Sequence, residues 1–154
     1  MLGFMLAFSI LVFPRFQTTW RSPLSATHRS EEITLYDANG EATAYIATSE
    51  ELTIYLWEGK PVAYLVPTRS GFSVYGFNGT HLGWFEGGIV RDHDGDAVGF
   101  VKGAIAMITS LESLKSLKEL KPLKALKELA PLKPAYSRQF SKMPLGLFLA
   151  AGAD

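Results

Sequence analysis

The stretch RDHDGD, residues 91–96, gathers most of the side chains in this sequence whose types and spacing could do chemistry. Aspartates at alternate positions resemble the start of a calcium-binding loop, where carboxylate oxygens surround the ion. An EF-hand loop that began at Asp92 would need a glutamate at its twelfth position, which is Gly103. The spacing therefore favours a turn over a metal site, and we expect neither a metal nor a cofactor.

The histidines offer little catalytic chemistry. His81 has no serine or cysteine of a recognisable nucleophile motif nearby, and His28 lies in a basic segment with no partner pattern. The sequence contains no glycine-rich phosphate loop before a helix, no Gly-x-Ser-x-Gly and no His-Glu-x-x-His. We therefore expect a protein that is not an enzyme.

The composition is that of one folded domain. The chain has 154 residues, of which 47% are hydrophobic and 19% are charged. It has no cysteine, so it can form neither a disulfide nor a thiolate metal site. We expect a cytoplasmic protein, either peripheral to a membrane or within a large complex.

The zero net charge hides an uneven distribution along the chain. Residues 31–104 carry eleven acidic and four basic side chains, whereas both flanking segments carry an excess of basic ones. Basic arms beside an acidic centre favour docking onto this centre or onto a neighbouring copy, and they provide no surplus charge for nucleic acid. We expect protein partners or other copies of the chain, and no nucleic acid.

Residues 1–32 form an arm that is apolar and then basic. The first thirteen residues carry no charge, a run too short to span a bilayer as a helix. A secretory signal would require a basic residue before the apolar run, and this sequence has none there. We expect this segment to contact a membrane surface or a protein partner, with Phe4, Leu6 and Phe8 as the contacting side chains. The alternative is an apolar arm that folds onto its own domain.

Four copies of one pattern follow, over residues 33–104. In each copy a glycine separates two apolar runs. In three copies it follows Asn or Asp, which is the strongest short-range signal for a β-hairpin, and Glu58-Gly59 is the weak member. The sequence predicts four hairpins with two-residue type I′ turns. The predicted turn residues are Asn39, Gly40, Glu58, Gly59, Asn78, Gly79, Asp94 and Gly95.

Counting outward from these turns separates two faces. Ile33 then faces Ile46 and Leu35 faces Ala44, and this face is apolar in all four copies. The other face is aromatic and amphipathic, with Thr34 opposite Tyr45 in the first copy. Because an isolated hairpin is marginal in water, the four hairpins must pack on one another.

The repeated pattern Y-x-x-N-G-x-x-x-G-[WYF]-Φ, and above all the stretch HLGWFEGGIVRDHDGDAVGF, resembles the bacterial four-fold β-flower family. The resemblance implies four short hairpins about a pseudo-four-fold axis over about residues 33–104. It implies no established activity and no catalytic residues. The fourth copy departs from the pattern, with Arg91 in place of tyrosine and Gly88 in place of a large apolar residue.

Residues 105–154 form a tail rich in leucine, lysine and proline that ends in an apolar segment. We expect this tail to be partly helical, with a helix over 110–121 capped by Thr109 and Glu112 and a second helix over 122–130; an extended path with three residues per turn is the alternative. We expect the leucines and Phe148 to contact a partner, and the lysines between them to face out or to meet acidic groups. The leucines recur at every third position: Leu111, Leu114, Leu117, Leu120, Leu123, Leu126, Leu129 and Leu132.

The sequence thus predicts a mainly β protein of four hairpin repeats with an apolar N-terminal arm and a leucine- and lysine-rich tail. The function that fits best is a non-catalytic structural or interaction subunit that docks into a larger assembly or homo-oligomer through its arms. One alternative is a membrane-surface adaptor. Another is a ligand-binding module that uses the aromatic face of the hairpins, with Trp84 among its rings.

Overall fold

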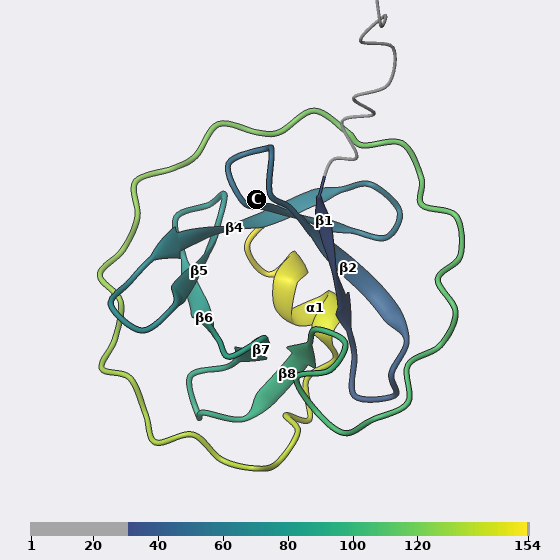
Figure 1. Cartoon of the computed structure of the whole chain (residues 1–154). Helices are drawn as coiled ribbons and strands as arrows, with labels where there is room; N and C mark the ends of the chain where they lie inside the picture. The colour runs from purple at the N-terminus through teal and green to yellow at the C-terminus, as the bar shows by residue number, and fades with distance from the viewer. Residues whose placement is uncertain (1–30, 154) are drawn as a thin grey trace, which may run out of the picture.

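In the computed structural model, which describes residues 31–153, eight antiparallel strands close into a barrel (Figure 1). Each strand pairs with the next along the chain, and β8 closes the sheet on β1. The four predicted hairpins are therefore confirmed as the repeating unit of the fold. In chain order the elements are β1 (Glu32–Tyr36), β2 (Ala42–Ala47), β3 (Thr53–Leu56), β4 (Pro61–Pro67), β5 (Phe72–Gly76), β6 (His81–Glu86), β7 (Ile89–Arg91), β8 (Ala97–Phe100) and the helix α1 (Leu145–Ala150).

The register of the hairpins agrees with the sequence pattern except beside the turns. Ile33 lies opposite Ile46, and Leu35 lies opposite Ala44, as predicted. Next to the turn, however, Tyr36 pairs with Ala42 instead of Thr43, and each of the other three hairpins has a register shift at the same place. Each hairpin therefore carries a β-bulge that the sequence analysis did not include.

The prediction of two-residue type I′ turns is wrong, because the loops have three residues. The Gly40 amide donates to the Asp37 carbonyl at 3.0 Å, and the Asp37 amide donates to the Glu41 carbonyl at 2.9 Å. This is the hydrogen-bond pattern of a three-residue loop whose last residue is left-handed, so the glycine occupies the third loop position. Gly40 has a φ of 76°, and the glycines of the other three turns are also left-handed.

The core of the barrel is formed by the apolar face predicted from the pairing, with a plug from the C-terminal end of the chain. Helix α1 lies inside the ring of strands in Figure 1, and its Leu145, Phe148 and Leu149 are buried among the strand side chains. The expectation that Phe148 contacts a partner is therefore wrong, since this ring completes the protein's own core. The strand residues of this core include Leu35, Ala44, Ile46, Ile54, Ala63, Leu65, Val74 and Val90.

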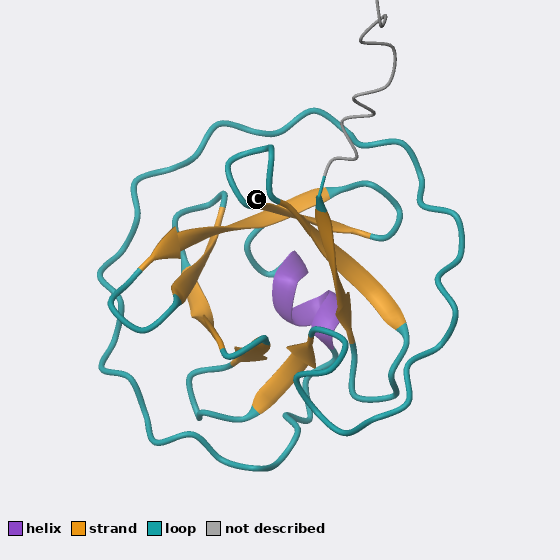
Figure 2. Ribbon diagram, in the orientation of Figure 1, coloured by secondary structure: helices purple, strands orange, loops and turns teal. Residues whose placement is uncertain are grey.

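The tail between the barrel and α1 encircles the barrel as an extended chain (Figures 1 and 2). Residues 107–137 form neither helix nor strand, so the predicted helices over 110–121 and 122–130 are wrong, and the helical part of the tail is α1. Leucines spaced by three would wind around a helix without forming one apolar stripe. The predicted cap at Thr109 also does not form: Glu112 instead accepts a hydrogen bond from the Tyr36 hydroxyl at 2.8 Å.

Candidate interaction surface

The tail is bound to the four hairpin turns at intervals of nine residues. At each turn a tail amide donates to the carbonyl oxygen of the turn glycine, at 2.8–3.1 Å. Four-fold repetition in the barrel is thus matched by a nine-residue repeat in the tail. The donor and acceptor pairs are Ser110 with Gly40, Glu119 with Gly59, Glu128 with Gly79, and Ser137 with Gly95.

The nine-residue repeat has a signal in the sequence that the analysis of leucine spacing missed. The four letters LKEL occur at residues 117–120 and again at 126–129, nine positions later. A period of three divides nine evenly, so the leucine pattern conceals the longer period. The sequence did not reveal what the tail binds, which is the set of hairpin turns of the same chain.

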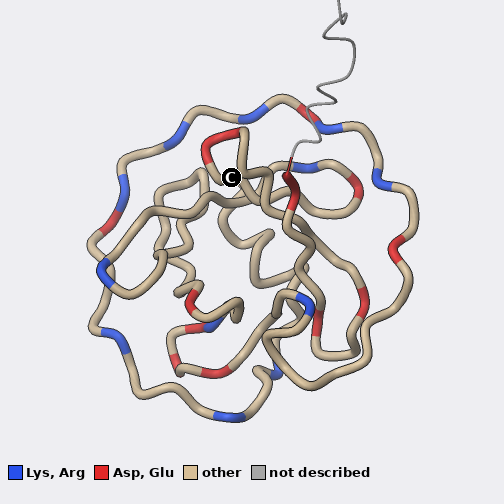
Figure 3. Tube along the Cα trace, in the orientation of Figure 1, with Lys and Arg blue, Asp and Glu red and all other residues tan. Residues whose placement is uncertain are grey.

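The lysines of the tail point inward, onto the aromatic outer face of the barrel. The Lys115 ammonium lies 4.6 Å from the centre of the Tyr45 ring, and the Lys124 ammonium lies 4.4 Å from that of Tyr64. These two lysines are themselves nine residues apart. Figure 3 shows the basic residues spaced along the encircling tail. The lysines therefore meet both rings and acidic groups of the barrel, the second of the two arrangements that the sequence allowed.

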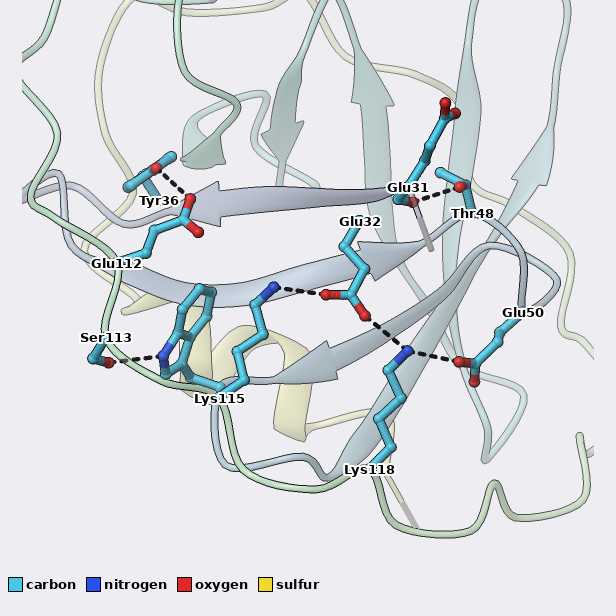
Figure 4. Close-up of polar contacts among 10 residues, drawn as sticks. Glu31, Glu32, Tyr36, Thr48, Glu50, Glu112, Ser113, Lys115 and Lys118 are labelled. Atoms are coloured by element: carbon cyan, nitrogen blue, oxygen red, sulfur yellow. Dashed lines mark hydrogen bonds and ion pairs between the residues drawn. The ribbon is translucent and has the colours of Figure 1, made fainter. Parts of the chain in front are cut away.

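An ionic network joins the tail to β1 and to the loop after β2 (Figure 4). The Lys118 ammonium donates to Glu32 at 2.8 Å and to Glu50 at 2.6 Å, and Lys115 donates to Glu32 at 2.6 Å. Burial alone would raise the pKa of Glu32, but the hydrogen bonds from the two lysines lower it below its ordinary value. The hydrogen bond from Lys118, followed by that from the Tyr55 hydroxyl, lowers the pKa of Glu50. These carboxylates are therefore held in the charged form.

The fourth quarter of the ring explains why Arg91 replaces the tyrosine of the other copies. Lys118 lies over Tyr55 and Lys127 over Tyr75, so the next position in the nine-residue series is 136. Residue 136 is a tyrosine, and the Arg91 guanidinium lies 4.4 Å from the centre of its ring. The cation and the ring have exchanged places between hairpin and tail, and the contact between them is kept.

With the lysines turned inward, the leucines project into solvent. The eight leucines of the three-residue series and Ile108 have exposed fractions of 91–98%, although large apolar side chains normally avoid such exposure. We call these nine residues the leucine girdle. Its members are Ile108, Leu111, Leu114, Leu117, Leu120, Leu123, Leu126, Leu129 and Leu132.

The aromatic face is not an open surface. Tyr45, Tyr55 and Trp84 are each at least 96% buried, and the lysines of the tail lie over the rings of Tyr45 and Tyr55. Tyr45 and Tyr55 stack on each other with ring centres 5.5 Å apart. A ligand therefore could not stack on these rings while the tail is in place, which removes the arrangement that the ligand-binding alternative required.

RDHDGD forms the fourth hairpin turn, beside a hollow that is also lined by residues of α1. Asp92 accepts hydrogen bonds from the amides of Asp94 and Asp96 at 3.0 Å each, as expected of a turn residue. His81 Nδ1 lies 2.9 Å from His93 Nε2, and both imidazoles line the hollow, which has a volume of about 670 Å³. Burial, aided by His93, lowers the pKa of His81 to about 4, so this imidazole is neutral at pH 7.

The predicted partner-contacting residues thus divide into three groups. The eight leucines are on the surface and are brought together in one girdle. Phe148 is in the core. Phe4, Leu6 and Phe8 lie outside the described residues, as does His28. Within residues 31–153 no helix is long and apolar enough to cross a membrane.

The fold therefore defines a class of protein: a closed barrel of four hairpins that is plugged by a C-terminal helix and encircled by the segment leading to it. A family model described as "4-fold beta flower protein" matches residues 33–149, and the chain belongs to this family. The match continues beyond the four hairpins through the tail to α1, so the tail is part of the family's pattern. Comparisons with curated proteins and with solved structures found no match.

Proposed function

We propose that this protein is a non-catalytic interaction subunit that docks onto other protein subunits through the leucine girdle. The observation that carries the proposal is the inverted order of side chains along the tail. Lysine normally extends its charged end into water while leucine packs inward. Here the lysines face the barrel and nine aliphatic side chains face outward. Such an apolar surface is a mark of a protein interface.

A membrane-surface adaptor is less well supported by the girdle. The tail that carries the exposed leucines runs around the whole barrel in Figure 1, so these leucines are distributed over several sides of the molecule. A flat bilayer could contact only one side of such a ring, whereas protein subunits can contact several sides. The N-terminal segment, which motivated the membrane hypothesis, lies outside the described residues.

Photo-crosslinking in living cells tests the proposal. Replacing Leu120 or Leu129 with p-benzoylphenylalanine places a photoreactive ring on the girdle, and the same substitution at Lys142, outside the girdle, provides the control. We expect protein adducts from the two girdle positions and none from the control. Adducts that are absent from both girdle positions, or equally strong at Lys142, would contradict the proposal.

A further inference from the structure

The leucine girdle is divided into equivalent edges by the nine-residue repeat. Each repeat places three outward side chains between successive hairpin turns, so the same apolar edge recurs on successive sides of the molecule. The first edge is Leu111, Leu114 and Leu117, and the second is Leu120, Leu123 and Leu126. The third edge begins with Leu129 and Leu132. Beyond Ser137 the chain turns onto β8, where the Ser141 amide donates to the Ala97 carbonyl, and the exposed residue that follows the last turn is Arg138.

We infer that copies of this protein associate side by side, with a leucine edge of one copy packed against a leucine edge of the next. The inference rests on the proposed function and names the partner as a second copy of the same chain. An edge that recurs within one molecule recurs on every copy, so any two copies present matching surfaces.

The spacing of the leucines makes each edge complementary to itself. An extended chain advances roughly 3.1–3.4 Å per residue, so side chains three residues apart stand about 10 Å apart. Apolar side chains in contact have heavy atoms about 4 Å apart, and a gap of this width accepts one leucine of an opposing row. Two edges that run in opposite directions can therefore interdigitate, leucine between leucines.

Charge does not oppose this contact. Most lysines that alternate with the leucines are paired with glutamates of the barrel, as Lys118 is with Glu32 and Glu50, and Lys124 with Glu51. Lys127 lies over the ring of Tyr75. The formal net charge of the whole chain is zero, a condition that favours association. Lysines that faced outward beside the leucines would have repelled a second copy.

The curvature of the girdle determines the strength of association. Two convex edges touch over about three leucines each. Such a contact buries less surface than the roughly 1,000 Å² that a stable pairwise interface buries. A single contact is therefore weak, and larger assemblies gain from several contacts at once. We expect association that depends on concentration and continues beyond the dimer, with at most three neighbours per copy.

Sedimentation of the full-length protein over a concentration series tests this inference. With increasing concentration, the apparent mass of the wild-type protein should rise from 16.9 kDa, the mass of one chain, to several multiples of it. The one-edge variant Leu120→Glu/Leu123→Glu, which places charges at two of the three leucines of the second edge, should form smaller assemblies. A six-fold variant should be monomeric; it combines these two substitutions with Leu111→Glu, Leu114→Glu, Leu129→Glu and Leu132→Glu. Arg138→Glu makes the same change in charge as the one-edge variant but at an exposed position outside the three leucine edges, and it should assemble as the wild type does.

Three results would overturn the inference: a wild-type protein that is monomeric at every concentration, assemblies that survive loss of all three edges, or Arg138→Glu acting like the one-edge variant. A monomer that floats with phosphatidylglycerol vesicles would point to the membrane alternative instead. In cells, crosslinks from Leu120 between two differently tagged copies are expected. Crosslinks only to a different protein would overturn the inference but leave the proposed function standing, whereas no crosslinks to any protein would contradict both.

Discussion

At the scale of single residues, the arrangement of the tail follows from what the barrel offers to a cation. The outer face of the barrel presents tyrosine rings beside Glu32 and Glu50, and this combination binds an ammonium group through both ring and carboxylate. A leucine at the same place would leave these carboxylates unpaired and partly buried. The lysines therefore take the inner positions, and the leucines are left on the outside.

Lys118→Met should lower the free energy of unfolding by about 1–2 kcal/mol at pH 7. The change removes two hydrogen bonds to carboxylates and the cation over Tyr55, while the aliphatic part of the side chain is kept. Lys121→Met is the matched control, because its ammonium lies 3.9 Å from the well-exposed Glu51, and it should cost less than about 0.5 kcal/mol. Equal effects in urea denaturation would contradict the role given to Lys118.

The pH dependence of the Lys118 effect has a definite sign. The pKa values of Glu32 and Glu50 are lowered in the folded state, from an ordinary value of 4.5. Their contribution is therefore complete above about pH 4.5 and is lost as the pH falls through the lower values of the folded protein. The difference in thermal unfolding midpoint between the wild type and Lys118→Met should shrink below pH 4.5. A difference that stays constant down to pH 3 would exclude this linkage.

His81 should affect the stability of the fold over a higher range of pH than Glu32 and Glu50 do. Burial, together with His93, lowers the pKa of His81 from 6.5 to about 4, although Glu128 opposes the shift. The unfolded chain then binds a proton that the folded protein does not, so stability falls between pH 6.5 and pH 4, by up to about 3 kcal/mol. His81→Gln should make the free energy of unfolding depend less on pH over this range. An unchanged slope in urea titrations at pH 7, 6 and 5 would contradict the assignment.

At the scale of elements, the hairpin turns and the tail depend on each other. The Leu117 carbonyl of the tail would lie 2.0 Å from a side-chain carbon added at Gly59, and the Leu126 carbonyl would lie 2.1 Å from one at Gly79. Glycine is thus needed at these turns for two separate reasons: the positive φ of the loop and the close approach of the tail. The sequence pattern revealed the first reason, and only the path of the tail reveals the second.

Gly59→Ala and Gly103→Ala separate these two reasons. Both glycines have a φ near 90°, but a side-chain carbon at Gly103 would meet nothing within 4 Å. Gly103→Ala should cost about 1–2 kcal/mol for the left-handed backbone alone. Gly59→Ala should cost clearly more, because the tail must also move away, and it should make the tail more sensitive to proteolysis near Leu117. Equal losses in chemical denaturation, with an intact tail in both variants, would mean that the tail is not docked at this turn.

Helix α1 offers a matched pair of leucines for a test of the plug. Leu149 is fully buried in the barrel, whereas Leu147 is 66% exposed. Leu149→Ala should lower the unfolding free energy by about 2–5 kcal/mol, as expected for a cavity in a core. Leu147→Ala, on the other side of the same helix, should cost less than about 1 kcal/mol. Similar costs for both variants would show that α1 does not plug the barrel in solution.

At the scale of the whole molecule, the parts predicted from the sequence are those whose contacts are local. The hairpins could be predicted because Gly40 and its counterparts lie between strands that pair directly with each other. The path of the tail could not, because its period of three fits several conformations and the turn glycines that accept its hydrogen bonds lie 42–70 residues away in the sequence. Phe148 likewise packs against strand residues that are far from it in the sequence, so the sequence alone predicted a partner contact in place of this core position.

The tail is anchored at both ends, by β8 and by α1, and this predicts how it opens. Its hydrogen bonds to the turns should break together with the barrel, because releasing the tail pulls on a helix buried in the core. Amide exchange measured by NMR should therefore show strong protection at Ser110, Glu119 and Glu128, with free energies close to that of global unfolding. The amides of Leu114 and Leu123, which have no backbone acceptor among the described residues, should exchange rapidly. Protection that decreases steadily along the tail would mean that the segment peels away from one end, and it would contradict a barrel, tail and helix that unfold as one unit.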